Sequence, residues 1–260
     1  MIPLVALLTD FGAGSVYVGQ LHAVLARLAP EARVLDLVHD VPPGDVEAGA
    51  YLLRQSVPHL PEACVVLAVV DPGVGTARAI LAGRAEGRSF VGPDNGLLAP
   101  VLGGGDARRL ENPALLPAHV SATFHGRDLM APLAARLACG LPRADGGWAV
   151  GPIPLAGGPR LANGVVVGRV LVVDRFGNLV TNVPATLLAR LEVPAREVRV
   201  RAGSAFVEGI VSTYADVPSG RALAYVGSGG HLEVGVHGGR AADLLRLAPG
   251  AEVRVERSRP

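Results

Sequence analysis

Three short segments of the chain end in a turn that carries an acid or a histidine. They are LVALLTDFG (4–12), CVVLAVVDPGVGTAR (64–78) and SATFHGRD (121–128). An apolar, β-branched run that stops at Asp-Phe-Gly or Asp-Pro-Gly is typical of a buried strand whose carboxyl end carries a charge. Open α/β sheets bind ligands along that edge. We therefore predict that Asp10, Asp71, Arg78 and His125 surround one cleft and that the chain is an enzyme.

The composition is that of a folded protein with little net charge. Half of the 260 residues are hydrophobic, 18% are charged, and the formal net charge is +1. This balance provides no field that would hold nucleic acid or an anionic membrane. Every apolar stretch is interrupted before it could span a bilayer, and the N-terminus lacks a signal-peptide pattern. We expect a cytoplasmic protein with no nucleic-acid or membrane partner and with Cys64 and Cys139 as buried free thiols.

The first part of the chain alternates strands with helices. The pattern predicts an α/β domain over residues 1–150, with a mostly parallel sheet covered by helices. Asp45 is the expected N-cap of the second helix. The expected strands are 4–8, 34–37, 64–70 and a pair at 79–85 and 89–91, and the expected helices are 18–28, 45–57 and 129–139.

The pattern changes after a segment rich in Gly and Pro, which we interpret as a linker over residues 151–163. Short strands separated by turn signals follow it, and they predict a small all-β domain over 164–260, a barrel or a sandwich. One helical segment, RAADLLRL, interrupts them. The expected strands are VVVGRVLVVD, EVRVR, LAYVGS, LEVGV and EVRVER.

Each candidate of the first domain has a functional and a structural interpretation. Asp10 can accept two hydrogen bonds from a ribose diol, or it can cap the following helix. Asp71, followed by Gly73 and Gly75, can act in catalysis beside Arg78, or the two can form an ion pair that closes a turn. The residues alone leave both interpretations open.

His125 is the best-placed proton carrier among the histidines, although a lone histidine is more often satisfied within a core. Gly126 leaves room beside it for a small molecule such as water. No HxH, HExxH or Cys/His spacing is present, so we expect no transition metal. A metal-dependent phosphohydrolase built on Asp10, Asp71 and Asp94 stays open as an alternative.

The second domain offers candidates for the other end of a ligand. In DRFGN, Asp174 could bind an ammonium group, Phe176 could stack on a base and Asn178 could hydrogen-bond to one. Ser228, in GSGGHLEVG, lies among backbone amides that suit a carboxylate, and Tyr214 is a second aromatic for stacking. A Gly-rich hairpin turn explains either segment equally well.

In this order, the segments resemble the SAM hydroxide adenosyltransferase family, the hydrolases of S-adenosylmethionine (SAM) that are related to fluorinases and chlorinases. The matching segments cover nearly the whole chain. They are TDFG followed by YVG, VPPGDVEAGAYLL, VVDPGVGTAR, VGPDNGLL, TFHGRD, DRFGNLVTN, YADVPSG and SGGHLEV.

The resemblance implies cleavage of SAM at C5′ of the ribose by water, giving adenosine and L-methionine without a cofactor. It implies that Asp71, Arg78 and His125 activate the water and that Asp10 binds the ribose diol. Substrate-binding positions on the methionine side are Asp174 and Ser228. Those on the adenine side are Asn178 and Tyr214. Apart from the resemblance, Phe176 and Asn95 are further substrate-binding candidates. The resemblance also implies a homotrimer whose sites lie between subunits.

The chain departs from the family pattern at two positions, Ser15, where an Asp is usual, and Gly44, where relatives often carry an aromatic. Halogenases have other residues in place of Asp71 and His125, and fluorinases have Ser in place of Gly126. Two alternatives remain beside hydrolysis, namely a halide-dependent adenosyltransferase and a non-catalytic sensor of SAM or adenosine.

Overall fold

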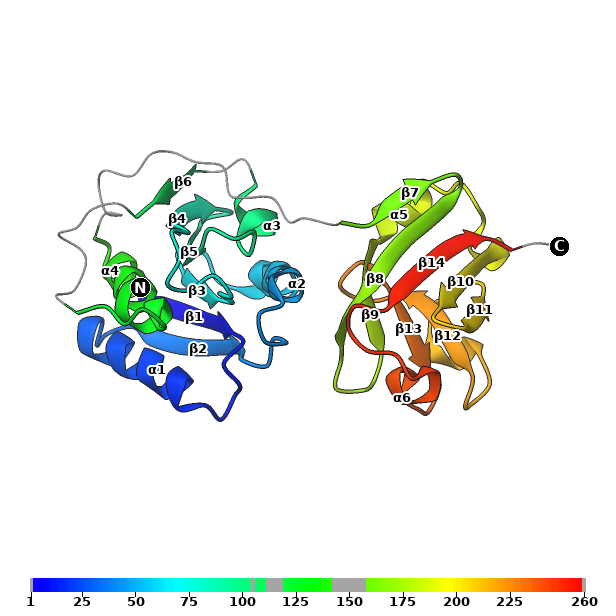
Figure 1. Cartoon of the computed structure of the whole chain (residues 1–260), viewed down its shortest axis with the longest axis horizontal. Coiled ribbons are helices and arrows are strands. Elements are labelled where there is room, and N and C mark those ends of the chain that lie inside the picture. Colours follow the sequence, from blue (N-terminus) through cyan, green and yellow to red (C-terminus); the bar gives the residue numbers. More distant parts are fainter. Residues whose placement is uncertain (1, 104–105, 111–118, 142–157, 259–260) are drawn as a thin grey trace. The chain divides into compact units, whose positions relative to one another are not determined.

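The computed structural model describes residues 2–103, 106–110, 119–141 and 158–258 (Figure 1). The chain divides into two compact units, Met1–Ala156 and Gly157–Pro260. Each unit contains one sheet, with buried hydrophobic side chains packed against it. The expectation of a mixed α/β chain with two sheets is confirmed.

The first unit is built on a six-stranded sheet in the order β2-β1-β3-β5-β4-β6. Strands β2, β1, β3 and β5 pair in parallel, whereas β4 is antiparallel to both of its neighbours. The strands are β1 (Leu4–Thr9), β2 (Arg33–Val38), β3 (Val65–Val69), β4 (Ile80–Ala85), β5 (Arg88–Pro93) and β6 (Asp106–Arg109).

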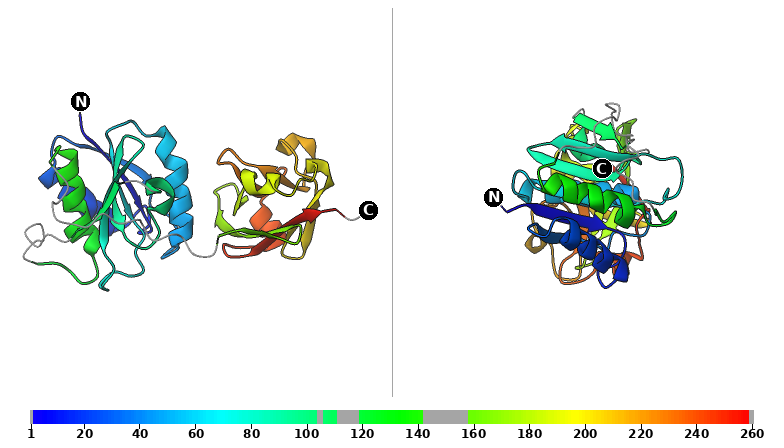
Figure 2. Two further views of the ribbon diagram at one scale, coloured as in Figure 1. Left: turned by 90° about the horizontal axis from the view of Figure 1, so that it is seen from above. Right: turned by 90° about the vertical axis from the view of Figure 1, so that its left-hand side faces the viewer.

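Helices cover both faces of this sheet, as the left view of Figure 2 shows. Helices α1 (Val16–Leu28) and α4 (Ala131–Ala138) pack together on one face, and α2 (Val46–Ser56) and α3 (Ala99–Leu102) contact each other on the opposite face. Every residue of β3 is buried. Because successive side chains of a strand point to opposite faces, the apolar residues of β1 and β3 make both faces of the sheet apolar. The predicted N-cap is confirmed, because Asp45 accepts a hydrogen bond from the Ala48 amide.

The register of the strands brings the charged turns to one edge. Thr9 at the end of β1 lies beside Val69 at the end of β3, so Asp10 and Asp71 both follow at the carboxyl edge. Strand β4 runs the other way, with Ile80 opposite Pro93. An antiparallel strand begins where its neighbour ends, so Arg78, just before β4, reaches the same edge.

The second unit is a strongly curved antiparallel sheet in the order β11-β10-β14-β8-β9-β13-β12, with β7 paired to β8. Its two end strands, β11 and β12, contact each other, so the sheet is nearly barrel-shaped. The strands are β7 (Arg160–Ala162), β8 (Val165–Val173), β9 (Leu179–Pro184), β10 (Val198–Ala202), β11 (Ala205–Glu208), β12 (Ala222–Val226), β13 (His231–Val236) and β14 (Glu252–Arg257). Two short helices, α5 (Ala185–Ala189) and α6 (Ala241–Leu245), complete the unit.

Several local features differ from the sequence-based expectations. The helix expected over 129–139 begins earlier, with a π-helical turn over Gly126–Met130 (η3) that runs into α4. Strands β9 and β11 were not expected. Cys64 is buried but Cys139 is exposed, because it follows α4 at the end of its last turn.

Residues 151–157 of the proposed linker lie outside the described residues, and its remainder, 158–163, includes strand β7. Strand β7 pairs with β8 through a two-residue turn at Asn163 and Gly164, which have φ values of 51° and 72°. Asn-Gly is the preferred sequence for such a hairpin turn. Within the described ranges, no helix is long and apolar enough to cross a membrane.

Candidate active site

The carboxyl edge of the first sheet forms a pocket of about 150 Å³, called here the carboxylate pocket. Residues from four separate segments line it, among them Asp10, Gly44, Asp71, Phe124, His125 and Gly126. The structure therefore brings Asp10, Asp71 and His125 together, as the sequence predicted. Arg78 lies directly behind them, in contact with Asp71 and His125.

Asp71 and Arg78 form a two-pronged, nearly buried ion pair. Arg78 Nε donates to Asp71 Oδ1 at 2.9 Å, and Arg78 Nη2 donates to Asp71 Oδ2. Only 5% of the Asp71 side chain and 10% of the Arg78 side chain are exposed. The planar guanidinium thus fixes the plane of the carboxylate in a way that lysine could not.

The loop between Asp71 and Arg78 can form because Gly75 adopts a φ of 80°. A Cβ at this position would lie 2.6 Å from the carbonyl oxygen of Ala122, in the segment that leads to His125. Glycine tolerates both the positive φ and the close backbone contact. The DPGVGTAR and TFHGRD segments are therefore packed directly against each other.

His125 is held by Arg78, whose Nη2 lies 2.9 Å from His125 Nδ1. Arginine has donors only, so Nδ1 must be the acceptor, and a neutral imidazole then carries its proton on Nε2. Burial and the positive charge of Arg78 lower the pKa of His125, an effect that Asp71 and Asp128 partly oppose. At neutral pH this histidine is a hydrogen-bond donor through Nε2.

Asp10 is part of a rigid turn between β1 and α1. Its Oδ2 accepts a hydrogen bond from the Gly44 amide at 2.8 Å, and burial raises the pKa of its carboxyl group. The preceding Thr9 hydroxyl lies 2.9 Å from Nδ1 of the buried His39, and the His39 carbonyl accepts from the Gly12 amide. Asp10 does not cap the next helix, because the N-cap of α1 is Ser15.

The second unit has an open pocket of about 610 Å³, called here the aromatic pocket. Phe176, Asn178 and Tyr214 line it, together with Val236, Gly238, Gly239 and Arg240. Phe176 is 78% exposed, which is unusual for an aromatic side chain in a folded unit. Asp174 receives two hydrogen bonds of 2.8 Å from Asn178, one from its backbone amide and one from Nδ2, and these hold the Asn178 side chain in place.

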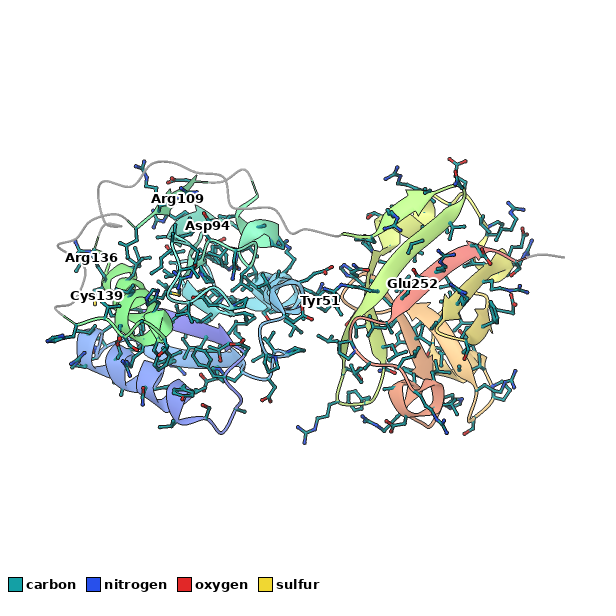
Figure 3. All side chains as sticks on the ribbon, in the orientation of Figure 1. Tyr51, Asp94, Arg109, Arg136, Cys139 and Glu252 are labelled. Carbon is teal, nitrogen blue, oxygen red and sulfur yellow. The ribbon has the colours of Figure 1, made fainter. Side chains whose placement is uncertain are left out.

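Asn95 and Asp94 lie at the same edge of the sheet but do not line the carboxylate pocket. The Asn95 side chain donates to the Val70 carbonyl at 2.9 Å and accepts from the Leu97 amide. Asp94 is buried and pairs with Arg109 at 3.3 Å, and both are labelled in Figure 3. Asp94 therefore does not join Asp10 and Asp71 in a three-carboxylate set, and the described residues contain no group of three acids, histidines or cysteines that could hold a metal ion.

Ser15 and Ser228 occupy different settings. Ser15 accepts a hydrogen bond from the Tyr17 amide as the N-cap of α1. Ser228 is exposed in the turn between β12 and β13.

Sequence reasoning missed a cluster of three aromatic rings beside the carboxylate pocket. Phe11, Tyr17 and Phe124 pack edge to face, with centroids 5.3 to 6.1 Å apart. The sequence contains a feature that could have predicted this cluster. An aromatic residue stands next to a candidate site residue in both TDFG and TFHG, in a chain with only 4% aromatic residues. The cluster provides an apolar wall on one side of the pocket.

Comparisons with known proteins agree over both units. The model of the SAM hydroxide adenosyltransferase N-terminal domain matches residues 5–147, and that of the C-terminal domain matches residues 168–254. The chain is 49% identical to the (R)-S-adenosyl-L-methionine hydrolase of Salinispora arenicola over 97% of each protein, and 28% identical to the fluorinase of Nocardia brasiliensis over 98% of this chain and 97% of that one.

A crystal structure of an uncharacterized conserved protein from Thermotoga maritima superimposes with a TM-score of 0.86 at 36% identity, over 97% of this chain and 100% of that one. Both family models and a relative that is nearly half identical over almost its whole length lead to one conclusion. The chain belongs to the SAM hydroxide adenosyltransferase family.

Proposed function

We propose that the protein hydrolyses SAM at C5′ of the ribose and gives adenosine and L-methionine. The observation that carries this proposal is the buried Asp71–Arg78–His125 set at the edge of the carboxylate pocket. The name of the Salinispora relative, (R)-S-adenosyl-L-methionine hydrolase, adds a stereochemical detail. We extend it to this chain and propose the R epimer at sulfur as the preferred substrate.

Departure of the leaving group needs little catalytic assistance. Sulfonium sulfur departs from C5′ as a neutral thioether while the water oxygen forms the new C5′–O bond. One proton of the water is released, so a cation and water become two neutral products and a proton. The reaction needs an aligned, partly deprotonated water in a dry site, and general-base assistance typically contributes ~10²–10⁴-fold.

The hydrogen bonds support a different role for each member of the set. Arg78 occupies His125 Nδ1, so the remaining His125 nitrogen donates a proton and cannot accept one. Asp71 is then the group that accepts the proton of the water, and His125 Nε2–H holds the water oxygen. Arg78 orients both partners without touching the substrate.

The substrate is divided between the two units. Asp10 binds the ribose diol, Phe176 and Tyr214 stack on adenine, and Asn178 bonds to its edge. Asp174 and Ser228 bind the methionine end. We assign Asn95 a positioning role rather than a direct contact, because its amide holds the Val70 carbonyl next to Asp71.

These roles correspond to a catalytic α/β domain and a small β-barrel domain, and they favour a shared site. The carboxylate pocket, at about 150 Å³, is smaller than the roughly 300 Å³ at which pockets for small-molecule ligands begin. The small volume supports a site that a second unit completes. As the family resemblance implies, we propose a homotrimer in which the first unit of one subunit and the second unit of the next complete each site. We place it in the cytoplasm and propose that it works without a cofactor.

Incubation of the purified protein with SAM that contains both sulfonium epimers is the direct test. We expect adenosine and methionine in equal amounts, with no added metal or halide and with EDTA present, and consumption of the R epimer first. Chromatography of the products and NMR of the remaining substrate measure this. A 5′-halo-adenosine as product in chloride or fluoride would indicate an adenosyltransferase, and tight binding without turnover would indicate a sensor.

Substitutions at the two pocket carboxylates should separate rate from affinity. Asp71→Asn is expected to lower kcat by about 10²-fold or more with a small change in KM, because its charge acts on the water. Asp10→Ala should mainly raise KM, because the diol contact is common to the ground state and the transition state. Steady-state kinetics on SAM measure both variants, and an identical pattern for the two would contradict these roles.

The arrangement around His125 predicts its titration. Because burial and Arg78 lower its pKa, His125 should stay neutral, with the proton on Nε2, to a lower pH than an ordinary histidine. Substituting Arg78→Met should raise the pKa of His125, since the nearby positive charge is lost while Asp71 and Asp128 remain. NMR of the imidazole nitrogens measures both effects, with the other histidines as internal controls. A protonated Nδ1 in the native protein would contradict the assignment.

Mixed subunits test the shared site. Asp71→Asn and Asp174→Ala each inactivate one half of it, so a dissociated and reassembled mixture should recover activity at interfaces that pair two intact halves. Light scattering should give three chains per particle, a closed ring with head-to-tail contacts. A fully active monomer, or a mixture with no recovered activity, would contradict this assembly.

A further inference from the structure

A hydrogen-bonded chain of three side chains lies behind the aromatic pocket. Strands β12 and β13 are antiparallel neighbours (Figure 1), and Tyr225 stands directly opposite Glu233. The Tyr225 hydroxyl donates to Glu233 Oε2 at 2.6 Å, and the Tyr214 and Tyr225 hydroxyl oxygens are 2.7 Å apart. The chain therefore runs from the pocket wall to a carboxylate that sequence reasoning did not single out.

The carboxylate sets the direction of the protons. An ionised Glu233 can only accept, so Tyr225 gives its single proton to Glu233 and its oxygen accepts the proton of Tyr214. Burial raises the pKa of Glu233, which the bond from Tyr225 opposes, and burial with the adjacent carboxylate raises the pKa of Tyr225. Tyr225 thus remains a donor, and the Tyr214 hydroxyl is fixed inward.

Packing fixes the other side of the Tyr214 ring. Gly235 lies two residues after Glu233 and so on the same face of β13. A Cβ at Gly235 would lie 2.9 Å from Asn178 Oδ1 and 3.0 Å from the Tyr214 ring. The amide of Asn178 and the ring of Tyr214 therefore rest directly on the backbone of this glycine.

The turn that carries Tyr214 is also capped. Tyr214–Asp216 form one turn of 3₁₀-helix, whose N-cap Thr213 and third residue Asp216 bond to each other's backbone. The backbone, the hydroxyl and one edge of the ring of Tyr214 are thus each held by a different contact. Such restraint is characteristic of a preorganised binding surface.

We propose that Glu233 and Tyr225 are positioning residues for the nucleoside, which hold the Tyr214 ring in place as a stacking wall of the aromatic pocket. This inference rests on the proposed function, which supplies adenosine as the ligand. A ring that is already oriented loses little freedom when a purine stacks on it, so the contribution is to affinity. Both residues act on binding through Tyr214, so we expect the rate of the chemical step to be unaffected.

The test uses three conservative variants, Tyr225→Phe, Glu233→Gln and Tyr214→Phe, of which the last keeps the ring and removes its anchor. Each should weaken adenosine binding and raise KM for SAM about tenfold, the size expected for one lost buried hydrogen bond, while kcat stays within about threefold of wild type. Glu208→Gln is the matched control, because it makes the same change in an exposed ion pair on β11. Calorimetry with adenosine and steady-state kinetics with SAM give the two readouts.

A double-mutant cycle separates positioning from a general loss of stability. If the chain acts as a unit, Tyr214→Phe/Tyr225→Phe should bind adenosine no more weakly than either single variant. Additive losses, or a loss in Glu208→Gln as large as in Glu233→Gln, would overturn the inference. Thermal unfolding of every variant identifies any that is unfolded, and the remaining variants then decide the outcome.

The two proposals fail in different ways. If wild type cleaves SAM but the three variants bind adenosine like wild type, the positioning role is wrong and hydrolysis stands. If wild type does not cleave SAM but the variants lose adenosine affinity together, the positioning role stands and hydrolysis is wrong. A wild-type protein that neither cleaves SAM nor binds adenosine overturns both.

Discussion

The paired hydrogen bonds of Arg78 are the interaction on which the geometry of the carboxylate pocket depends. One guanidinium fixes the plane of the Asp71 carboxylate and also occupies Nδ1 of His125. It thereby makes one neighbour an acceptor and the other a donor, although both could serve as bases when considered alone. In the proposed mechanism the set differs in this respect from a serine-protease triad, in which the histidine takes the proton.

The sheet explains how distant segments meet around the carboxylate pocket. Parallel strands β1 and β3 deliver Asp10 and Asp71 at their carboxyl ends, and the reversed strand β4 delivers Arg78 from its amino end. The π-helical turn after His125 then places the imidazole at the start of a helix that continues into the core. Such turns are often found at functional sites, where they re-aim one side chain without ending the helix.

The second unit provides an open surface held by a partly buried polar network. Asp174 holds the Asn178 amide, and Glu233 holds Tyr214 through Tyr225. Two carboxylates thus orient an amide and an aromatic ring from behind. Their negative charge also suits a cationic substrate, since a low local dielectric strengthens such attraction.

The sequence by itself determined the buried strands, the helix that Asp45 caps and the turns that carry Asp10, Asp71 and His125, because apolar periodicity and turn chemistry are local properties. The motifs in their order also determined the family. Tertiary structure alone decided which nitrogen of His125 bears the proton, that Asn95 supports a strand end, and that Glu233 joins Tyr225 and Tyr214. The hairpin at Asn163 and Gly164 could have been predicted from its Asn-Gly pair, but that pair lies at the end of the Gly-rich segment that was interpreted as a linker. The proton position on His125, the role of Asn95 and the link from Glu233 to Tyr214 depend on strand register and on contacts between residues far apart in the chain. No local sequence pattern records such contacts.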